Sequence, residues 1–156
     1  MATYINPEVR LAETAEDKQK CIDVRVRVFV DEQKYPLHTE TEDPYDVDCI
    51  HWVAICEYRS MRIPVGTVRM YPVSPTVGKL GRLAVLQDAR GLQLGVKLVQ
   101  ALIKEAHDRG KTAIVLHAQY DKQGFYEKLG FVVEKGDEET FLEDGTPHIR
   151  MWNRSI

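Results

Sequence analysis

The sequence of 156 residues has only three cysteines and no long apolar run, and each shortage excludes a class of protein. Cys21, Cys49 and Cys56 fit neither a disulfide framework nor paired zinc knuckles, so we expect them to be reduced. The longest uninterrupted apolar run, Trp52 to Cys56, is far shorter than the ~20 residues that cross a bilayer. Met1 to Arg10 lacks the apolar centre of a secretory signal. We therefore expect a cytoplasmic protein without a membrane partner.

The chain also lacks a basic excess, since 21 Lys and Arg stand against 24 Asp and Glu. A general nucleic-acid binder usually carries strong positive charge, so no nucleic-acid partner is expected. The charges are unevenly spread. Tyr35 to Tyr58 contains six acids and no Lys or Arg, whereas Lys79 to Lys111 contains seven basic residues and three acids. Such segments could form an anion-binding and a cation-binding wall of one cleft, or two ordinary solvated surfaces.

A chain of this length, 44% hydrophobic, can build one core, and no repeat or linker divides it. We expect a single domain over residues 1–156. Short segments rich in Val, Ile, Thr and aromatics predict strands, and helical patterns lie between them, which indicates an α/β or α+β domain on a mixed sheet. The predicted strands are Glu8–Ala12, Ile50–Tyr58, Pro64–Val73, Val77–Leu86, Thr112–Ala118, Phe131–Glu134, Thr140–Leu142 and Pro147–Asn153.

Three segments predict helices. Gly91–Arg109 carries an apolar stripe at helical spacing, and a glycine follows it; Lys122–Leu129 is shorter and also ends before a glycine. Residues 14–30 are ambiguous, because their first residues fit a helix N-cap whereas four valines alternate as in a strand. We interpret this segment as a helix with Arg25 and Arg27 on or near its exposed side.

The segment from Gly81 to Gly95 combines an apolar strand, a tight turn and a helix start. A helix N-terminus has unpaired N–H groups and a positive dipole end, so it can hold a diphosphate if bulky side chains stay away. Gly91 and Gly95 give such access, and Arg90 could add a charge-assisted hydrogen bond. The glycine spacing alone fits a helix cap with two packing glycines equally well.

At this turn the sequence resembles the GCN5-related N-acetyltransferase (GNAT) superfamily. The family's acetyl-CoA loop follows the pattern Q/R-x-x-G-x-G/A, filled here by Arg90, Gly91, Leu92, Gln93, Leu94 and Gly95. Gln93 replaces the usual first glycine, so one N–H would approach a phosphate less closely. Phe125–Phe131 is similar to the family's FYeklGF signature. Segments similar to the ElaA-type branch of small GNAT proteins are Val28–Gln33, the acidic stretch through Asp48, His51, Leu116–Gln119 and Pro147–Met151.

The resemblance implies the GNAT fold, a mixed, mostly antiparallel sheet of six or seven strands flanked by about four helices. Its fourth and fifth strands would splay apart around acetyl-CoA, the implied cosubstrate. The residues implied to bind this cofactor are Leu83, Ala84, Val85, Arg90, Gly91, Leu92, Gln93, Leu94, Gly95, Gln119 and Tyr126.

Acetyl transfer to an amine sets the chemical roles. A lysine-like amine has a pKa of ~10 and must lose a proton before it attacks, the oxyanion needs an N–H donor, and the departing thiolate needs a proton. The resemblance assigns the donor to Val85 and the general acid to Tyr126. His117 is suitable as the base, as are Glu32, Glu40 and Glu42 through water. A strand histidine is also often structural, which applies equally to His51 and His148.

The acidic stretch lies where the family builds its acceptor wall, so a small cationic amine is the expected acceptor, with protein or peptide amines as alternatives. The candidate substrate-binding residues are Glu32, Glu40, Glu42, His51 and His148. No metal is expected, because these histidines and acids show no recognised metal spacing. We expect an acetyl-CoA-dependent N-acetyltransferase that acts by direct transfer in a ternary complex, as a monomer or homodimer.

Two other functions compete with this interpretation. A GNAT-fold module that senses acyl-CoA without turnover would accommodate Gln93 in the loop. A Rossmann dinucleotide-binding protein fits less well, because the glycines follow several strands and no acidic residue lies at the expected ribose-binding distance, ~20 residues further on.

Overall fold

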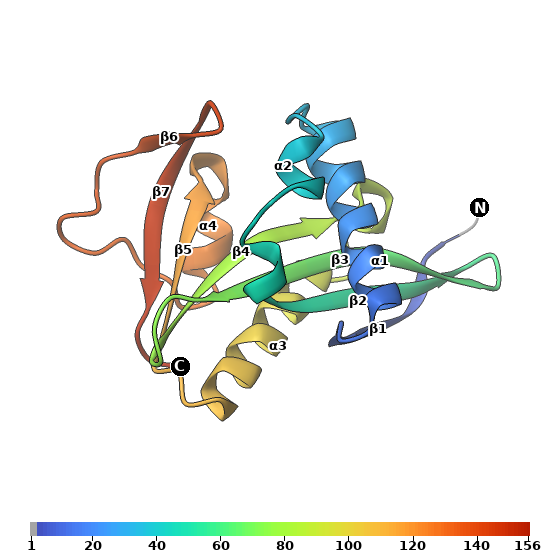
Figure 1. Cartoon of the computed structure of the whole chain (residues 1–156), viewed down its shortest axis with the longest axis horizontal. Coiled ribbons are helices and arrows are strands. Elements are labelled where there is room, and N and C mark those ends of the chain that lie inside the picture. Colours follow the sequence, from blue (N-terminus) through green and yellow to red (C-terminus); the bar gives the residue numbers. More distant parts are fainter. Residues whose placement is uncertain (1–2) are drawn as a thin grey trace.

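The computed structural model describes residues 3–156, which form one seven-stranded sheet with helices on both faces (Figure 1). The strand order is β1-β2-β3-β4-β5-β7-β6, and only β4 and β5 pair in parallel. The strands are β1 Ile5–Leu11, β2 Ile50–Tyr58, β3 Met61–Pro72, β4 Val77–Val85, β5 Ala113–Gln119, β6 Phe141–Glu143 and β7 Thr146–Asn153. The predicted fold class, with its mixed and mostly antiparallel sheet, is confirmed.

One predicted strand is wrong. Within Phe131–Glu134 only Val132 pairs with the sheet, through a single bridge to Trp152 of β7. The side chain of Phe131 is buried, whereas Val132 is 55% exposed. The segment is apolar because Phe131 anchors it to the core, and it leaves the edge of β7 after one residue.

The ambiguous segment is a helix, as predicted. The helix α1, Ala15–Arg25, begins at Thr14, whose hydroxyl accepts a hydrogen bond from the Asp17 amide at 3.0 Å. It continues as a π-helical turn, Val26–Glu32, so the alternating valines do not form a strand. Arg27 is exposed as expected. The prediction for Arg25 is wrong, because its side chain is only 1% exposed and lies among carboxylates.

Of the other helices, α3 and α4 lie near the predicted positions, whereas α2 was not predicted. The short α2, His38–Thr41, precedes a 3₁₀ turn at Asp46–Asp48 on the face of the sheet that carries α1. The opposite face carries α3, Leu94–Asp108, and α4, Gln123–Glu127. The predicted start of α3 at Gly91 is three residues early, because Gly91 and Gln93 both have positive φ. No helix of residues 3–156 is long and apolar enough to cross a membrane.

β4 and β5 separate halfway along their length. Their parallel pairing runs from Val77 opposite Ala113 to Leu80 opposite Leu116 and then stops. On the side that faces β3, β4 carries a bulge: between the pairs Arg69–Gly81 and Thr67–Ala84, β3 advances by two residues and β4 by three. Arg82 lies in this bulge and has a φ of +52°. A bulge bends its strand. The end of β4 therefore leaves β5, and the predicted splay of the central strands is confirmed.

Candidate active site

The turn before α3 leaves the helix N-terminus without a side-chain cap. Its N-cap residue is Gln93, which makes no side-chain capping hydrogen bond, and the first turn contains no acid. Because the first N–H groups of a helix have no partners within it, these amides remain available to a ligand. The dipole of a 15-residue helix adds partial positive charge at the same point. The arrangement is suited to a diphosphate, as the sequence predicts.

The positive backbone angles explain the motif residues in this turn. Gly91 has a φ of +102°, which L side chains rarely adopt, and a Cβ there would meet no atom within 4 Å. Its requirement is therefore conformational. Gln93 has a φ of +59° and a ψ of 26°, the left-handed conformation that a glycine adopts freely. Gln93 thus keeps the backbone conformation expected of the glycine it replaces.

Gly95 serves a different purpose, the close packing of α3 on α4. A Cβ at Gly95 would lie 3.2 Å from the ring of Phe125, tighter than an ordinary contact. Phe125 in turn packs edge-on against Tyr126, with ring centroids 5.0 Å apart. The second glycine of the motif therefore sets the distance between the helix that offers its N-terminus and the helix that carries the predicted acid.

Arg90 bridges the turn to the end of α1. Its guanidinium donates to both carboxylate oxygens of Glu32, at 3.0 and 3.2 Å, and to the Val85 carbonyl at 3.1 Å. Arg90 and Glu32 are exposed, and such pairs add little stability. An arriving anion can therefore exchange with Glu32 on Arg90 at small cost.

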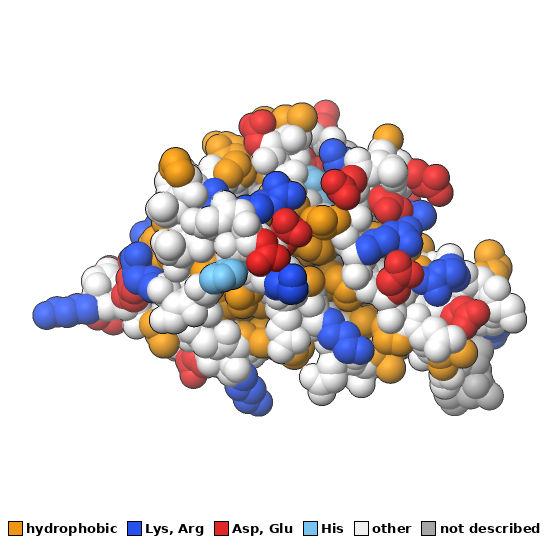
Figure 2. Space-filling view, turned by 90° about the horizontal axis from the view of Figure 1, so that it is seen from below, with side chains coloured by type: hydrophobic (Ala, Val, Ile, Leu, Met, Phe, Trp, Pro, Cys, Tyr) orange, Lys and Arg blue, Asp and Glu red, His pale blue; other side chains and the backbone are white. Residues whose placement is uncertain are grey.

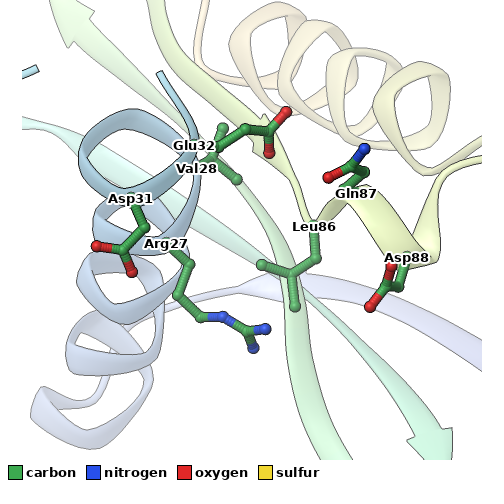
Figure 3. Close-up of a pocket in the computed structure, with 7 residues that line it drawn as sticks. All are labelled: Arg27, Val28, Asp31, Glu32, Leu86, Gln87 and Asp88. Carbon is green, nitrogen blue, oxygen red and sulfur yellow. The ribbon is translucent and has the colours of Figure 1, made fainter. Parts of the chain in front are cut away.

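Two pockets flank this turn. One, of about 340 Å³, lies between the end of α1 and residues 86–88, with Val28 and Leu86 among its walls and Arg27 at its side (Figure 3). The other, of about 450 Å³, lies between the turn and Tyr4 and Tyr58, whose rings stack 4.7 Å apart. Asp88 lines both pockets. The turn therefore offers space on each side for the parts of a long, anionic ligand.

The main chain of Val85 points toward the opening between β4 and β5. The Leu86 amide donates to the Val65 carbonyl at 2.8 Å, so Leu86 and Val65 form a hydrogen-bonded antiparallel pair. Because such pairs alternate, the neighbouring pair of Gly66 and Val85 is not hydrogen bonded. The Val85 amide is therefore directed away from β3, to the side from which β5 has diverged.

Tyr126 lies in α4, and its ring packs on Phe125 and Phe131 in the core. The residue is only 9% exposed, and its hydroxyl makes no hydrogen bond to any other residue in the range 3–156. Burial raises the pKa of Tyr126 above its ordinary value, so the phenol keeps its proton throughout the neutral range. A protonated, uncommitted hydroxyl can donate to a thiolate.

His117 lies on β5, one residue beyond the last pair with β4. Its Nδ1 lies 3.0 Å from Oε1 of Glu143, and the other oxygen of Glu143 lies 3.6 Å from Nε2 of His148. The hydrogen bond from His117 lowers the pKa of Glu143 despite partial burial, so this carboxyl is ionised. Glu143 therefore orients His117 with Nδ1 as the donor and Nε2 as the acceptor, which faces Arg150 Nε at 3.5 Å.

The remaining predicted acceptor residues have different surroundings. Glu40 is 4% exposed, and its Oε1 accepts from Arg25 and Arg82 at 3.1 and 3.0 Å. His51 is also buried; its Nε2 donates to the Asp46 carbonyl at 2.9 Å, and burial lowers its pKa. Glu42 is exposed. Of the predicted residues, the structure brings His117 and His148 together through Glu143 and places Glu32, Glu40 and His51 elsewhere.

A network of three arginines and three carboxylates fixes the acidic stretch to the sheet. Arg69 pairs with Asp43 and Asp46, both at 2.8 Å. The same two acids pair with the other arginines, Asp46 with Arg25 at 2.8 Å and Asp43 with Arg82 at 3.1 Å. These acids are therefore neutralised by cations of the fold and do not form an exposed acidic wall.

Comparison with known proteins assigns the family. The model of the acetyltransferase (GNAT) family matches residues 15–131, which include α1, the turn before α3 and Tyr126. The chain belongs to this family. A Bacillus subtilis protein named as an unproven acetyltransferase is 36% identical over 145 residues, which are 92% of this chain and 93% of that one.

Solved structures of other proteins share the fold of this GNAT chain. Escherichia coli ElaA superposes with a TM-score of 0.77 at 24% identity, covering 95% of this chain and 99% of that one. An acyl-CoA N-acyltransferase from Pseudomonas aeruginosa gives a TM-score of 0.75 at 26% identity, covering 95% and 98%. The protein is an acetyl-CoA-dependent N-acetyltransferase, and acetyl-CoA is its cosubstrate.

Sequence reasoning gave no role to two residues that contact predicted site residues. Glu143 gave no signal, because the hairpin of β6 and β7 brings it to His117 from 26 positions away. Gln33 accepts a hydrogen bond on its Oε1 from Gln119 Nε2 at 2.9 Å, which joins the end of the π-helical turn to the end of β5. Its place as the last residue of Val28–Gln33, the segment similar to the ElaA-type branch, was the one available clue.

Proposed function

We propose that the enzyme acetylates the primary amine of a small molecule, which binds as its ammonium ion, by direct transfer in a ternary complex. The observation that carries the proposal is the parting of β4 and β5 after Leu80 and Leu116. It leaves the Val85 amide on one side of an opening and His117 on the other. One chain contains every proposed group, so a monomer suffices.

Acetyl-CoA supplies the thioester and a thiol leaving group. The amides of Leu94 and Gly95 at the α3 N-terminus, together with Arg90, would hold its diphosphate, and Leu83, Ala84 and Gln119 would line its pantetheine arm. The uncapped helix end and the left-handed conformation of Gln93 support this placement. Leu92 lines the pocket beside the turn and would cover the nucleotide end.

His117 would act as the base. His117 donates its Nδ1–H to Glu143, so its Nε2 can accept a proton. The attacking amine would first take the place of the Arg150 Nε–H, which lies 3.5 Å from Nε2. The negative charge of Glu143 attracts the ammonium ion of the acceptor. His148 and Glu42 would contact the acceptor. Glu32, Glu40 and His51 would act indirectly, through the packing of the segment between α1 and β2 that borders the acceptor.

The Val85 amide would donate to the negative oxygen that develops at the acyl carbon, as its orientation toward the opening favours. Tyr126 would transfer its proton to the thiolate, and its raised pKa ensures that it starts protonated. The imidazolium of His117 then returns the amine's proton through solvent to the Tyr126 phenolate, which restores both residues. The proton that the ammonium ion loses to solvent before it attacks is the one net proton released.

An amine library tests the proposal. Purified enzyme, acetyl-CoA and pools of polyamines, aminosugars, amino acids and peptides are incubated, and mass spectrometry detects products heavier by one acetyl group. Acetylation of a small amine, absent without enzyme, is the expected result. Exclusive acetylation of peptides or proteins, or failure of every amine while calorimetry shows acetyl-CoA binding, would contradict it.

A further inference from the structure

Lys79 lies on β4, next to the point where β4 and β5 part, on the side of the sheet where the proposed acceptor would bind. It pairs with Val115 of β5 one position before the last pair, Leu80 with Leu116. Paired residues point to the same face of a sheet, and residues two apart along a strand share that face. Lys79 therefore lies on the same face as His117, which is two residues beyond Val115.

This face also carries α1 and α2. On β4, Gly81 is two residues from Lys79 and pairs with Arg69, whose side chain contacts Asp43 and Asp46 of the segment after α2. Lys79 thus projects to the side from which an acceptor reaches His117. The opposite side of β4 carries Leu80, which is 3% exposed and packs in the core.

The Lys79 ammonium has no partner in the part of the chain that the structure describes. It makes no hydrogen bond, and no carboxylate oxygen of residues 3–156 lies within 4.0 Å of its Nζ. Yet the residue is half-buried. A half-buried cation without an anion loses hydration and receives no compensating contact.

The acids that might have paired with Lys79 are engaged elsewhere. Glu143 is close enough to raise the pKa of Lys79, but its two oxygens face His117 and His148. Asp43 and Asp46 belong to the arginine network. Burial lowers the pKa of Lys79, and the guanidinium of Arg150 acts in the same direction. The sheet surface next to His117 therefore carries the positive charge of Lys79, which no carboxylate of residues 3–156 pairs with.

Building on the proposed function, we propose that the acceptor carries an anionic group, a carboxylate or a phosphate, in addition to its amine, and that Lys79 binds this group. The acceptor is then dipolar, with its ammonium end at Glu143 and His117 and its anionic end at Lys79. Arg150, which forms a 3.5 Å contact with Asp137 at the edge of the same face, adds positive potential. Lys79 determines specificity and takes no part in proton transfer.

Matched acceptors test this inference. We would measure kcat/KM for lysine, lysinamide and cadaverine as a carboxylate series, and for phosphoethanolamine and ethanolamine as a phosphate series. In one series the member that bears the carboxylate or phosphate should exceed the members without it by about 10-fold or more, the size of one charge-assisted hydrogen bond. The series in which this occurs identifies the anionic group. Equal rates for members with and without that group in both series would overturn the inference.

Variants then assign the preference to Lys79. Lys79→Met should lower kcat/KM about 10- to 100-fold for the preferred acceptor with an anionic group. For the matched acceptor without that group, kcat/KM should fall less than about 3-fold. Lys79→Arg should restore part of the preference, and the control Lys97→Met, at an exposed position on α3, should leave it intact. Melting curves verify folding, which Lys79→Met should preserve because no ion pair is broken.

The outcomes separate the inference from the proposed function. Equal losses of kcat/KM in Lys79→Met for acceptors with and without the anionic group would contradict a role of Lys79 in specificity. Such a result would leave the proposed acetyl transfer intact. Failure of every amine with the wild-type enzyme would contradict the proposed function, and the inference with it.

Discussion

His117 Nδ1 lies 3.0 Å from Glu143 Oε1, so a strand histidine at the opening of the sheet is held by a carboxylate from the neighbouring hairpin. The pair fixes the tautomer that leaves Nε2 free to accept a proton. It also ties the β6–β7 hairpin to β5 on the acceptor side. If His117 is the base, Glu143 is the residue that positions it.

The first prediction concerns this pair. His117→Ala should lower kcat about 100-fold, the lower range for loss of a general base, with little change in KM for acetyl-CoA. Glu143→Gln keeps a hydrogen-bond acceptor but removes the charge, so kcat should fall about 10-fold and its pH profile should shift. Steady-state kinetics from pH 6 to 9 measures both. Wild-type kcat in His117→Ala would exclude the histidine.

Tyr126→Phe should separate turnover from binding. The hydroxyl makes no hydrogen bond within residues 3–156, and the ring supplies the packing, so the variant should fold normally. Loss of the proton donor should lower kcat about 100-fold, while the Kd for acetyl-CoA stays within about 2-fold. Thiol-release assays and calorimetry provide the two values. An unchanged kcat would remove Tyr126 from the mechanism.

Two substitutions in the turn should differ in their effect on acetyl-CoA binding. Gly91→Ala places a Cβ at a φ of +102°, which costs about 1–3 kcal/mol and should weaken acetyl-CoA binding about 10-fold. Gln93→Gly keeps the left-handed conformation already present, so the Kd should stay within about 3-fold. Calorimetry compares them. A larger loss of affinity in Gln93→Gly than in Gly91→Ala would contradict the assignment of this turn.

The buried arginine network should dominate the stability of the segment between α2 and β2, residues 42–49. Arg25→Met leaves Glu40 and Asp46 without one of their cations, and breaking a buried pair costs about 3–5 kcal/mol. For a chain of this size the melting temperature should fall by roughly 10 °C or more. Arg62→Met, which breaks an exposed pair with Glu8, should cost less than about 1 kcal/mol. Similar losses in both variants would show that the network adds nothing.

The same network predicts an acid limb in stability. Burial opposes ionisation of Asp46, but the guanidiniums of Arg25 and Arg69 outweigh it and hold its pKa below the ordinary value. A carboxyl with a lowered folded pKa stabilises the protein fully above its unfolded pKa of ~3.9, and that stabilisation is lost as the pH falls through the folded pKa. Asp46→Asn should therefore be less stable than wild type at pH 7 and lose less stability between pH 5 and 3. The melting temperatures of both proteins are measured from pH 7 to 3. An equal fall between pH 5 and 3 in the two proteins would contradict this prediction.

Local patterns predicted much of the fold. β2 has the bounds that its apolar run predicts, Ile50–Tyr58, and the stripe of α3 predicted that helix apart from its first turn. The burial of Arg25 was not predictable, because its partners Glu40 and Asp46 lie 15 and 21 residues further on. A charged side chain in a helix is expected outside unless its counterions are known.

The site divides in the same way. The turn at Gly91 is encoded within six residues, so its likeness to a family motif was visible in the sequence. The pairing of His117 with Glu143 and the unpartnered ammonium of Lys79 depend on which strands lie together and in which register. Charge counts alone suggested an acidic wall, but they could not reveal that Asp43 and Asp46 are paired with arginines.

The extra residue in β4 makes the length of that strand as important as its composition. Arg82 holds a φ of +52°, a conformation sustained by its bonds to Glu40 and Asp43. Deleting this one position would set two residues of β4 opposite two of β3 and remove the bulge that bends the strand. The end of β4 would then continue beside β5, the opening that the Val85 amide faces would close, and acetyl transfer should be lost although no reacting group had been replaced.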